Sequence, residues 1–196
     1  MERGKFKNKY RIASARAPFW DYGWNAAYFV TICTQNRECW FGNVVNGLMD
    51  LSPIGHIANS CWHEIPNHFP FVVLGAHIVM PNHVHGMVII DKPDDGQNDG
   101  RNVGTQNFAS LQPGAAPSSK CKKPKNQFGP QTKNLASIVR GFKIGVTKNA
   151  RQINPNFAWQ PRYHDHIVRD DQSFERITGY IFNNPAKWRE DKFYST

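Results

Sequence analysis

Two histidines lie two residues apart in an apolar segment of the 196-residue sequence: His83 and His85, separated by Val84. In an extended strand, alternate side chains point to the same face, about 7 Å apart along the chain. Both imidazoles would therefore face one side of a sheet while Val84 faces the other. Two convergent imidazoles can share one metal ion. A histidine pair on a solvated sheet face is also a common structural feature, so the pair alone does not assign a metal site.

Tyr180 and Asn184 form a second pair with chemical potential, near the C-terminus. Residues four apart lie on one face of a helix, with roughly 6 Å between their Cβ atoms. A phenol and an amide oxygen can therefore approach one site together. The alternative is structural, because a tyrosine on an amphipathic helix usually packs at the core or its rim, and an asparagine before a proline ordinarily ends a helix.

Other residues of the same types compete with these two pairs. His164 and His166 form a second His-x-His, but the residue between them is the polar Asp165. We expect a half-exposed strand there, near the site. Tyr163 is a rival nucleophile. It has no polar residue one helical turn later, and a tyrosine in a strand is usually a packing residue, so we favour Tyr180.

The strands that must position these residues follow from composition and alternation. Two apolar runs, 71–80 and 83–91, are joined by a Pro-Asn dipeptide that suits a tight reversal, and they predict a hairpin. Residues 28–34 are rich in β-branched and aromatic residues and predict a first strand, followed by a hairpin return over 38–45. Residues 163–169 predict a further strand.

Three segments carry apolar residues at helical spacing. The first has Ser52 as its N-cap and ends at Pro66, the second covers 134–151 with one basic face, and the third is capped by Ser173. The order strand, helix, strand, strand, helix, strand and one extra helix predicts an α+β, ferredoxin-like (split βαβ) fold. Its antiparallel sheet would have helices on one face plus an extra C-terminal helix that carries Tyr180. Folds of this plan host many functions.

Composition restricts the class of protein. The chain has 24 Lys+Arg against 15 Asp+Glu, a formal net charge of +9, and 40% hydrophobic residues, which suits one globular domain with its own core. No apolar run approaches the roughly 18 residues of a membrane span, and no secretory signal is recognisable, so we expect a cytoplasmic protein. The excess positive charge favours a polyanion, most commonly nucleic acid. Solubility alone is the other explanation.

The composition also divides the chain into segments. Residues 1–24 are predicted to be a basic N-terminal arm, and residues 25–196 a single domain. Within that domain, the segment at about 92–133 consists of Asp, Gly, Asn, Pro, Ser and Lys with almost no aliphatic residues, which predicts a flexible insertion. The four cysteines have neither zinc-ligand nor disulfide spacing and are predicted to be free thiols.

Four motifs follow one another over about residues 28–190: HIVMPNHVHGMVII, then LASIVRGFK after a gap, WQPRYHDHIVRD and YIFNNPAKW. Their order and spacing resemble those of the REP-associated tyrosine transposases, relatives of the single-tyrosine HUH transposases of insertion sequences. In that family the histidine pair flanks a hydrophobic residue, here Val84. The nucleophilic tyrosine precedes a polar metal ligand by four positions, here Asn184. The long insertion at about 92–133 departs from the family.

The resemblance implies a DNA strand transferase acting on single-stranded DNA beside hairpins, in a bacterial cytoplasm at the nucleoid, without a membrane partner. It implies Tyr180 as the nucleophile, a 5′-phosphotyrosine intermediate, and a divalent cation, Mg²⁺ or Mn²⁺, on His83, His85 and Asn184. A phenol of pKa about 10 is only about one part in a thousand ionised at pH 7, so a cation is needed to offset that deficit. Imidazole pairs also suit zinc. Monomer and homodimer remain open.

Basic residues are the predicted DNA-binding set: Arg140, Lys143, Arg151, Arg162 and Lys187. With the N-terminal arm they would contact phosphates, while aromatic side chains would stack on unpaired bases. Two other classes of function stay open. One is a domesticated protein that binds structured DNA without strand transfer, and the other is a metal-dependent phosphodiesterase that passes water to phosphate.

Overall fold

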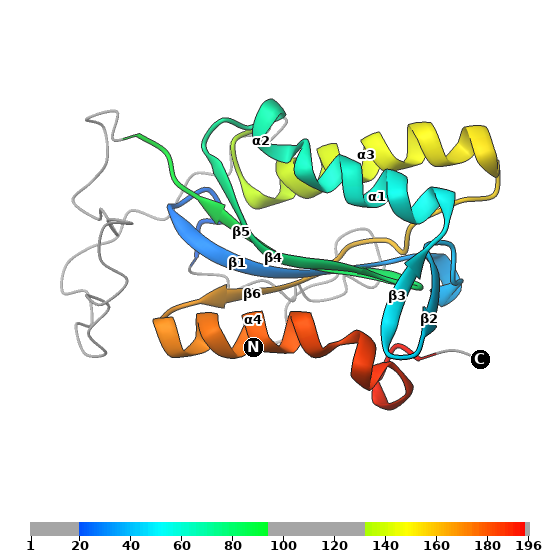
Figure 1. Ribbon diagram of the computed structural model, residues 1–196. Coiled ribbons are helices and arrows are strands. Elements are labelled where there is room, and N and C mark those ends of the chain that lie inside the picture. The colour runs from blue at the N-terminus through cyan, green and yellow to red at the C-terminus, as the bar shows by residue number, and fades with distance from the viewer. Residues whose placement is uncertain (1–19, 94–131, 195–196) are drawn as a thin grey trace, which may run out of the picture.

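The computed structural model describes residues 20–93 and 132–194. Over these ranges a four-stranded sheet has the order β4-β5-β1-β6, with every neighbouring pair antiparallel (Figure 1). Its strands are β1 (Ala26–Cys33), β4 (Val72–Met80), β5 (His83–Ile90) and β6 (His164–Val168). The predicted N-terminal arm and insertion fall largely outside the described residues, as does Cys121, whereas Cys33, Cys39 and Cys61 are free thiols.

The helices complete the predicted α+β, ferredoxin-like fold. Within the described residues they are α1 (Pro53–His63), α2 (Ile65–His68), α3 (Leu135–Ile153) and α4 (Asp171–Asn183), with short 3-10 helices η2 (Gln35–Arg37) and η4 (Pro185–Glu190). α1, α2 and α3 cover one face of the sheet, and α4 covers the other (Figure 1). The predicted extra helix therefore occupies the face that the others leave open. None of the described helices has the length and apolarity that a membrane crossing requires.

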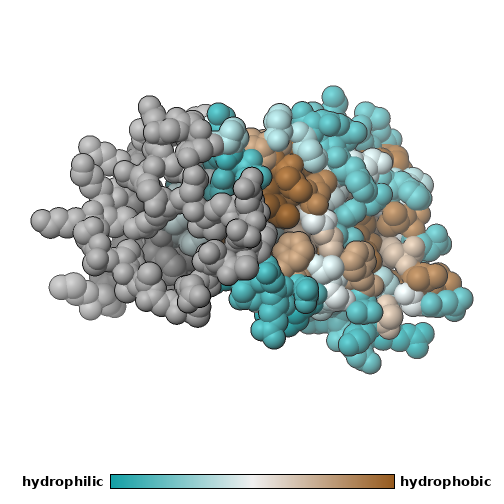
Figure 2. Space-filling model, turned by 60° about the vertical axis from the view of Figure 1, so that its left-hand side comes forward, coloured by the Kyte–Doolittle hydropathy of each residue, from teal (hydrophilic) through white to brown (hydrophobic). Residues whose placement is uncertain are grey.

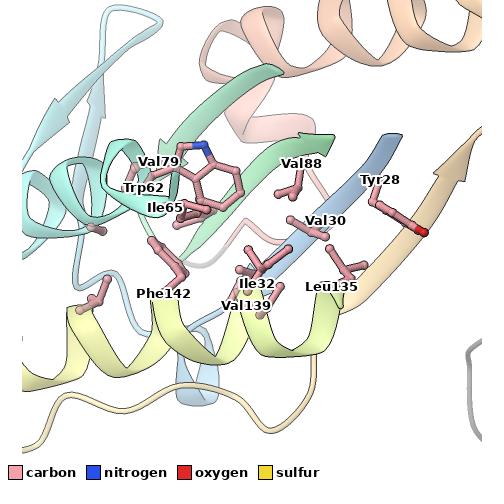
Figure 3. Packing of buried hydrophobic residues seen from close by; sticks show 14 of the residues in the cluster. Tyr28, Val30, Ile32, Trp62, Ile65, Val79, Val88, Leu135, Val139 and Phe142 are labelled. Carbon is pink, nitrogen blue, oxygen red and sulfur yellow. The ribbon is translucent and has the colours of Figure 1, made fainter. Parts of the chain in front are cut away.

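Two core clusters lie on the two faces of the sheet. The larger one fills the space between the sheet and α1 and α3, where Trp62 and Phe142 pack over strand residues such as Val30 (Figure 3). The smaller one lies under α4 and includes Met87 and Ile181. On the face shown in Figure 2, hydrophobic side chains form separate patches among hydrophilic ones, as expected when most apolar area lies inside such clusters.

The return strand predicted over 38–45 was wrong in its partner. β2 (Gly42–Val45) pairs with β3 (Leu48–Leu51) and not with β1. Asn46 and Gly47 form the connecting loop, with φ of 51° and 75°. An Asn-Gly loop of two residues favours this left-handed conformation and is a strong hairpin signal, so the sequence did contain the cue for β3.

The predicted helix ends were wrong at two places. α1 ends at His63, and Pro66 lies in the first turn of α2, where its missing N–H costs no hydrogen bond. α4 begins before Ser173, because Asp170 is its N-cap and accepts a hydrogen bond from the Ser173 N–H. The Ser52 cap of α1 is confirmed, since its side chain accepts from the Gly55 N–H.

A half-buried histidine of β4 lies between the sheet and α1. His77 Nε2 is 3.0 Å from the Asn59 Oδ1, and its ring stacks on Trp62 with centroids 5.8 Å apart. Burial lowers the pKa of His77 to about 4, and the neighbouring His63 adds to the effect. The folded protein therefore resists protonating this ring.

His77 makes the stability depend on pH. Below its unfolded pKa of about 6.5 the unfolded chain binds a proton that the folded state does not bind until about pH 4, so the free energy of unfolding falls across that window. His77→Gln is expected to lessen this loss by roughly 1–2 kcal/mol, an amount reduced by solvent screening. Urea unfolding at pH 7 and pH 4.5 measures it. An equal loss of unfolding free energy in the wild-type protein and in His77→Gln would show that His77 does not cause this pH dependence.

Candidate functional site

The histidine pair of β5 lies on the α4 face of the sheet. Val84 packs in the large core, so the alternation of the strand turns His83 and His85 toward the opposite side. Their ring centroids are 4.4 Å apart. Their exposed fractions are only 0% and 1%. The two histidines are therefore not a pair on a solvated sheet face. Phe193 and Trp188 lie over His83, with centroids at 4.7 and 6.0 Å.

Hydrogen bonds hold both rings at Nδ1. His83 Nδ1 is 2.8 Å from the Asn82 Oδ1, and His85 Nδ1 is 2.9 Å from the Thr31 Oγ1. The Nε2 atom of His83 is buried and has no hydrogen-bond partner among the residues that the structure describes. His85 Nε2 lies 3.3 Å from the Tyr180 Oη. Both Nε2 atoms are thus left for a ligand or a nucleophile.

α4 carries Tyr180 to this pair. Ile177 and Ile181 of the helix pack in the small core, which fixes the helix against the sheet. The Tyr180 ring then contacts His85 edge-on, with centroids 5.3 Å apart, while 43% of the residue stays exposed. Burial raises the pKa of Tyr180, and the nearby Asp191 carboxylate raises it further. The side chain is therefore a neutral phenol that is accessible from solvent.

Asn184 and Asp191 complete the cluster. Asn184 caps the end of α4, its Nδ2 donates to Asp191 Oδ2 at 3.1 Å, and its Oδ1 is buried without a partner in the described part of the chain. One ligand atom each of His83, His85 and Asp191 lie within 4.8 Å of one another. Sequence reasoning missed Asp191, because η4 turns the chain back and no periodicity marks such a turn.

The charge states of this cluster suit metal binding. Burial lowers the pKa of His83 to about 3, and the cations of Lys192 and Arg37 lower it further. Burial also lowers the pKa of His85 well below its usual value, with His83 adding to the effect. Both rings are therefore neutral at pH 7 and offer lone pairs. Two imidazole nitrogens, a carboxylate and an orphaned amide oxygen form a donor set that fits a divalent cation.

The rival residues lie elsewhere on the sheet. His164 and His166 pair with Thr31 and Phe29, so they share the sheet face of the histidine pair, but they are exposed on β6 at the sheet edge. Tyr163 packs against the large core, on the opposite face. The structure therefore brings Tyr180, and not Tyr163, to the two histidines.

Four of the five predicted DNA-binding residues line one groove. This groove of about 580 Å³ runs along α3 and is lined by Arg140, Lys143, Arg151 and Arg162 together with apolar residues. It lies on the sheet face opposite the histidine pair. Lys187 lies apart from it, in η4 beside the β2–β3 hairpin.

Two of these side chains also hold the chain in place. Lys143 Nζ donates to the carbonyl oxygens of Gln160 and Arg162 at 2.9 and 2.7 Å, and burial lowers its pKa to about 8. Arg151 Nε donates to the Phe157 carbonyl at 3.1 Å. Arg140 is exposed, so it is the better probe of DNA contact in this groove.

Comparison with known proteins gives two sequence relatives and several structural neighbours. The chain is 37% identical over 182 residues to an uncharacterized protein of Haemophilus influenzae, covering 92% of each chain. It is 24% identical over 168 residues, 85% of this chain and 74% of the other, to a Haemophilus influenzae protein named "Putative REP-associated tyrosine transposase". No family model matches the chain.

One of the structural neighbours is a REP-associated tyrosine transposase bound to a REP hairpin. The TM-score is 0.56 with 18% sequence identity, over 92% of this chain and 77% of that chain. At this identity the likeness shows that the two proteins share a fold.

Proposed function

We propose that this chain is a REP-associated tyrosine transposase and that it cleaves and rejoins single-stranded DNA beside hairpins through a covalent bond to Tyr180. The observation that carries the proposal is the position of the Tyr180 Oη, 3.3 Å from Nε2 of the buried His85, in a cluster with the buried His83 and the half-buried Asp191. A nucleophile and a set of metal ligands are thus brought together from two distant parts of the chain, 83–85 and 180–191.

Tyr180 would attack the scissile phosphate. The Oη–P bond forms, the bond to the 3′ oxygen breaks, and a 5′-phosphotyrosine and a free 3′-hydroxyl result; a second 3′-hydroxyl can reverse the step and join a new strand. The raised pKa of Tyr180 means that its proton must leave during the attack. The acceptor that a bound cation would leave open is Asp191 Oδ2, 3.5 Å from the Oη, because His85 Nε2 at 3.3 Å would use its lone pair as a metal ligand.

His83, His85, Asn184 and Asp191 would hold the divalent cation, for which we propose Mg²⁺ or Mn²⁺. When bound, such an ion polarises the phosphate and stabilises the charge that develops in the transition state. The residues themselves supply preorganisation, because both rings are buried and held at Nδ1 before any metal arrives.

The groove along α3 would contact the DNA backbone. The structural neighbour is bound to a REP hairpin, and we propose that this chain also recognises a hairpin. Arg162 and Tyr163, which line the groove, come directly before the edge strand β6 in the chain. The single strand beside a hairpin bound in this groove would therefore pass around β6 at the sheet edge to reach the face that carries Tyr180.

Removing charge from the groove should weaken DNA binding. The exposed cations Arg140 and Lys148 line the groove, and replacing both with Gln should lower the affinity and reduce the salt slope by at most about two units. Fluorescence anisotropy at several salt concentrations measures it. Lys143→Gln is a contrasting variant, since it should also lower stability by freeing two carbonyl groups. An unchanged salt slope in Arg140→Gln/Lys148→Gln would place the DNA elsewhere.

Covalent trapping tests the proposed function directly. The full chain is incubated with Mn²⁺ and a 3′-labelled single strand that contains a hairpin, and the products are separated under denaturing conditions. A labelled protein band is expected, together with a shorter unlabelled strand. Cleavage without a covalent band would favour the phosphodiesterase that uses water. Binding without cleavage would favour the domesticated DNA-binding protein.

A further inference from the structure

We infer that Asn82 is a positioning residue for the metal site, because one buried amide fixes the tautomer of His83 and holds the C-terminal segment that carries Asp191. The inference rests on the metal site of the proposed function. It concerns the state of that site before metal or DNA binds, and it can be tested in the absence of DNA.

The orientation of the Asn82 amide follows from its neighbours. Asn82 is fully buried, and its Nδ2 donates to two backbone carbonyl oxygens, Arg37 O at 3.1 Å and Phe193 O at 2.8 Å. A flipped amide would place its oxygen against both carbonyls, which is unfavourable for three acceptors. The Oδ1 atom must therefore be the one that faces His83, 2.8 Å from Nδ1.

This orientation decides where the imidazole proton of His83 lies. An amide oxygen only accepts hydrogen bonds, so the neutral ring must carry its proton on Nδ1. The lone pair is then on Nε2, the buried atom without a partner in the described residues. His85 is different, because its Nδ1 faces the Thr31 hydroxyl, which can donate or accept. Of the two histidines of the site, only His83 has its tautomer set by a group of fixed polarity.

The same amide holds the other side of the site. The Phe193 carbonyl accepts from Asn82, and the Phe193 N–H donates to Asp191 Oδ1 at 2.7 Å. Asp191 is thus linked to Asn82 through one residue. His83 and Asp191 are 108 positions apart in sequence (191 − 83), so the amide brings together ligands that no local structure connects.

The backbone around Asn82 is equally constrained. The Asn82 carbonyl accepts from both the N–H and the Oγ1 of Thr34, each at 2.9 Å. Asn36 and Arg37 have φ of 53° and 58°, a left-handed conformation that is costly for residues with a side chain. This left-handed conformation occurs where the Arg37 carbonyl accepts a hydrogen bond from Asn82 Nδ2. Hydrogen bonds therefore hold both the backbone carbonyl and the side-chain amide of Asn82, so the amide can fix the positions of His83 and Phe193.

Two substitutions separate the two roles. Asn82→Asp keeps an acceptor for the Nδ1 proton of His83 but loses the donor to the Phe193 carbonyl. Asn82→Leu loses both. Nitrogen-15 NMR of the metal-free protein reports the tautomer, hydrogen exchange of the Phe193 amide reports the C-terminal segment, and calorimetry reports Mn²⁺ affinity. Asn59→Leu is the control, because Asn59 also faces a histidine, His77, outside this site.

The expected pattern is specific. Wild-type His83 should carry its proton on Nδ1, Asn82→Asp should keep that tautomer while the Phe193 amide exchanges faster, and Asn82→Leu should lose both with about a 10–100-fold drop in Mn²⁺ affinity. Asn59→Leu should keep wild-type affinity. Wild-type Mn²⁺ affinity in Asn82→Leu would overturn the inference.

A proton on Nε2 of His83 in the wild-type protein would also overturn the inference, even if neither variant folds. If these results hold but no covalent DNA adduct forms, the proposed strand transfer falls and the role of Asn82 stands. If the adduct forms and Asn82→Leu binds Mn²⁺ with wild-type affinity, the proposed strand transfer stands and the role of Asn82 falls.

Discussion

Tyr180→Phe is expected to abolish cleavage, joining and the covalent adduct, each by at least about 1,000-fold, while DNA affinity stays near wild type. The substitution removes one oxygen from a side chain that is 43% exposed. The ring can keep its contacts with His85 and Phe29, at centroid distances of 5.3 and 6.2 Å. Denaturing gels for the adduct and anisotropy for binding separate chemistry from affinity.

Tyr163→Phe is the matched control. Tyr163 packs on the other face of the sheet, against the large core and beside the groove of α3, so this substitution should spare all three reactions. An adduct that persists in Tyr180→Phe and disappears in Tyr163→Phe would transfer the nucleophile to the second tyrosine. An adduct unaffected by either change would exclude chemistry at both tyrosines.

The parts of the site that the sequence predicts are those set by local periodicity. The alternation of a strand places His83 and His85 on one face whatever the strand pairs with. The helical repeat likewise puts Tyr180 and Asn184 together. What packs over these residues is decided by distant segments. Sequence reasoning therefore could not predict that the histidine pair is almost fully buried.

The parts that the sequence does not predict depend on turns and long-range contacts. Asp191 reaches the histidines because η4 redirects the chain after α4, and no repeat in the sequence encodes that turn. Lys143 lies on the basic face of α3, as expected. Its bonds to the carbonyls of Gln160 and Arg162 depend on a segment that a helical repeat does not describe.

The pairing of strands is a further feature of the fold that composition alone does not predict. The composition of 38–45 favours a strand, but composition does not say which edge it meets. The two-residue Asn46-Gly47 loop decides that β2 pairs with β3. The fold class could be predicted because the strands and helices follow one another in the pattern of a split βαβ fold, which leaves few alternatives.

His83→Ala and His85→Ala are expected to abolish metal-dependent cleavage and to weaken Mn²⁺ binding at least about 10-fold, since each removes one of the proposed nitrogen ligands. Both residues are buried, so each variant should also lose roughly 1–3 kcal/mol of stability. Calorimetry for Mn²⁺, cleavage assays and urea unfolding together distinguish the loss of a ligand from the loss of packing.

His77→Ala provides the matched comparison for these two variants. His77 is a half-buried histidine on the neighbouring strand and contacts α1 instead of Tyr180. Its replacement should lower stability by a similar amount while Mn²⁺ affinity and cleavage remain. If His77→Ala lost cleavage as completely as His85→Ala, the effect of the latter would reflect a weakened fold. If His83→Ala or His85→Ala cleaved DNA normally in Mn²⁺, that histidine could not be an essential metal ligand.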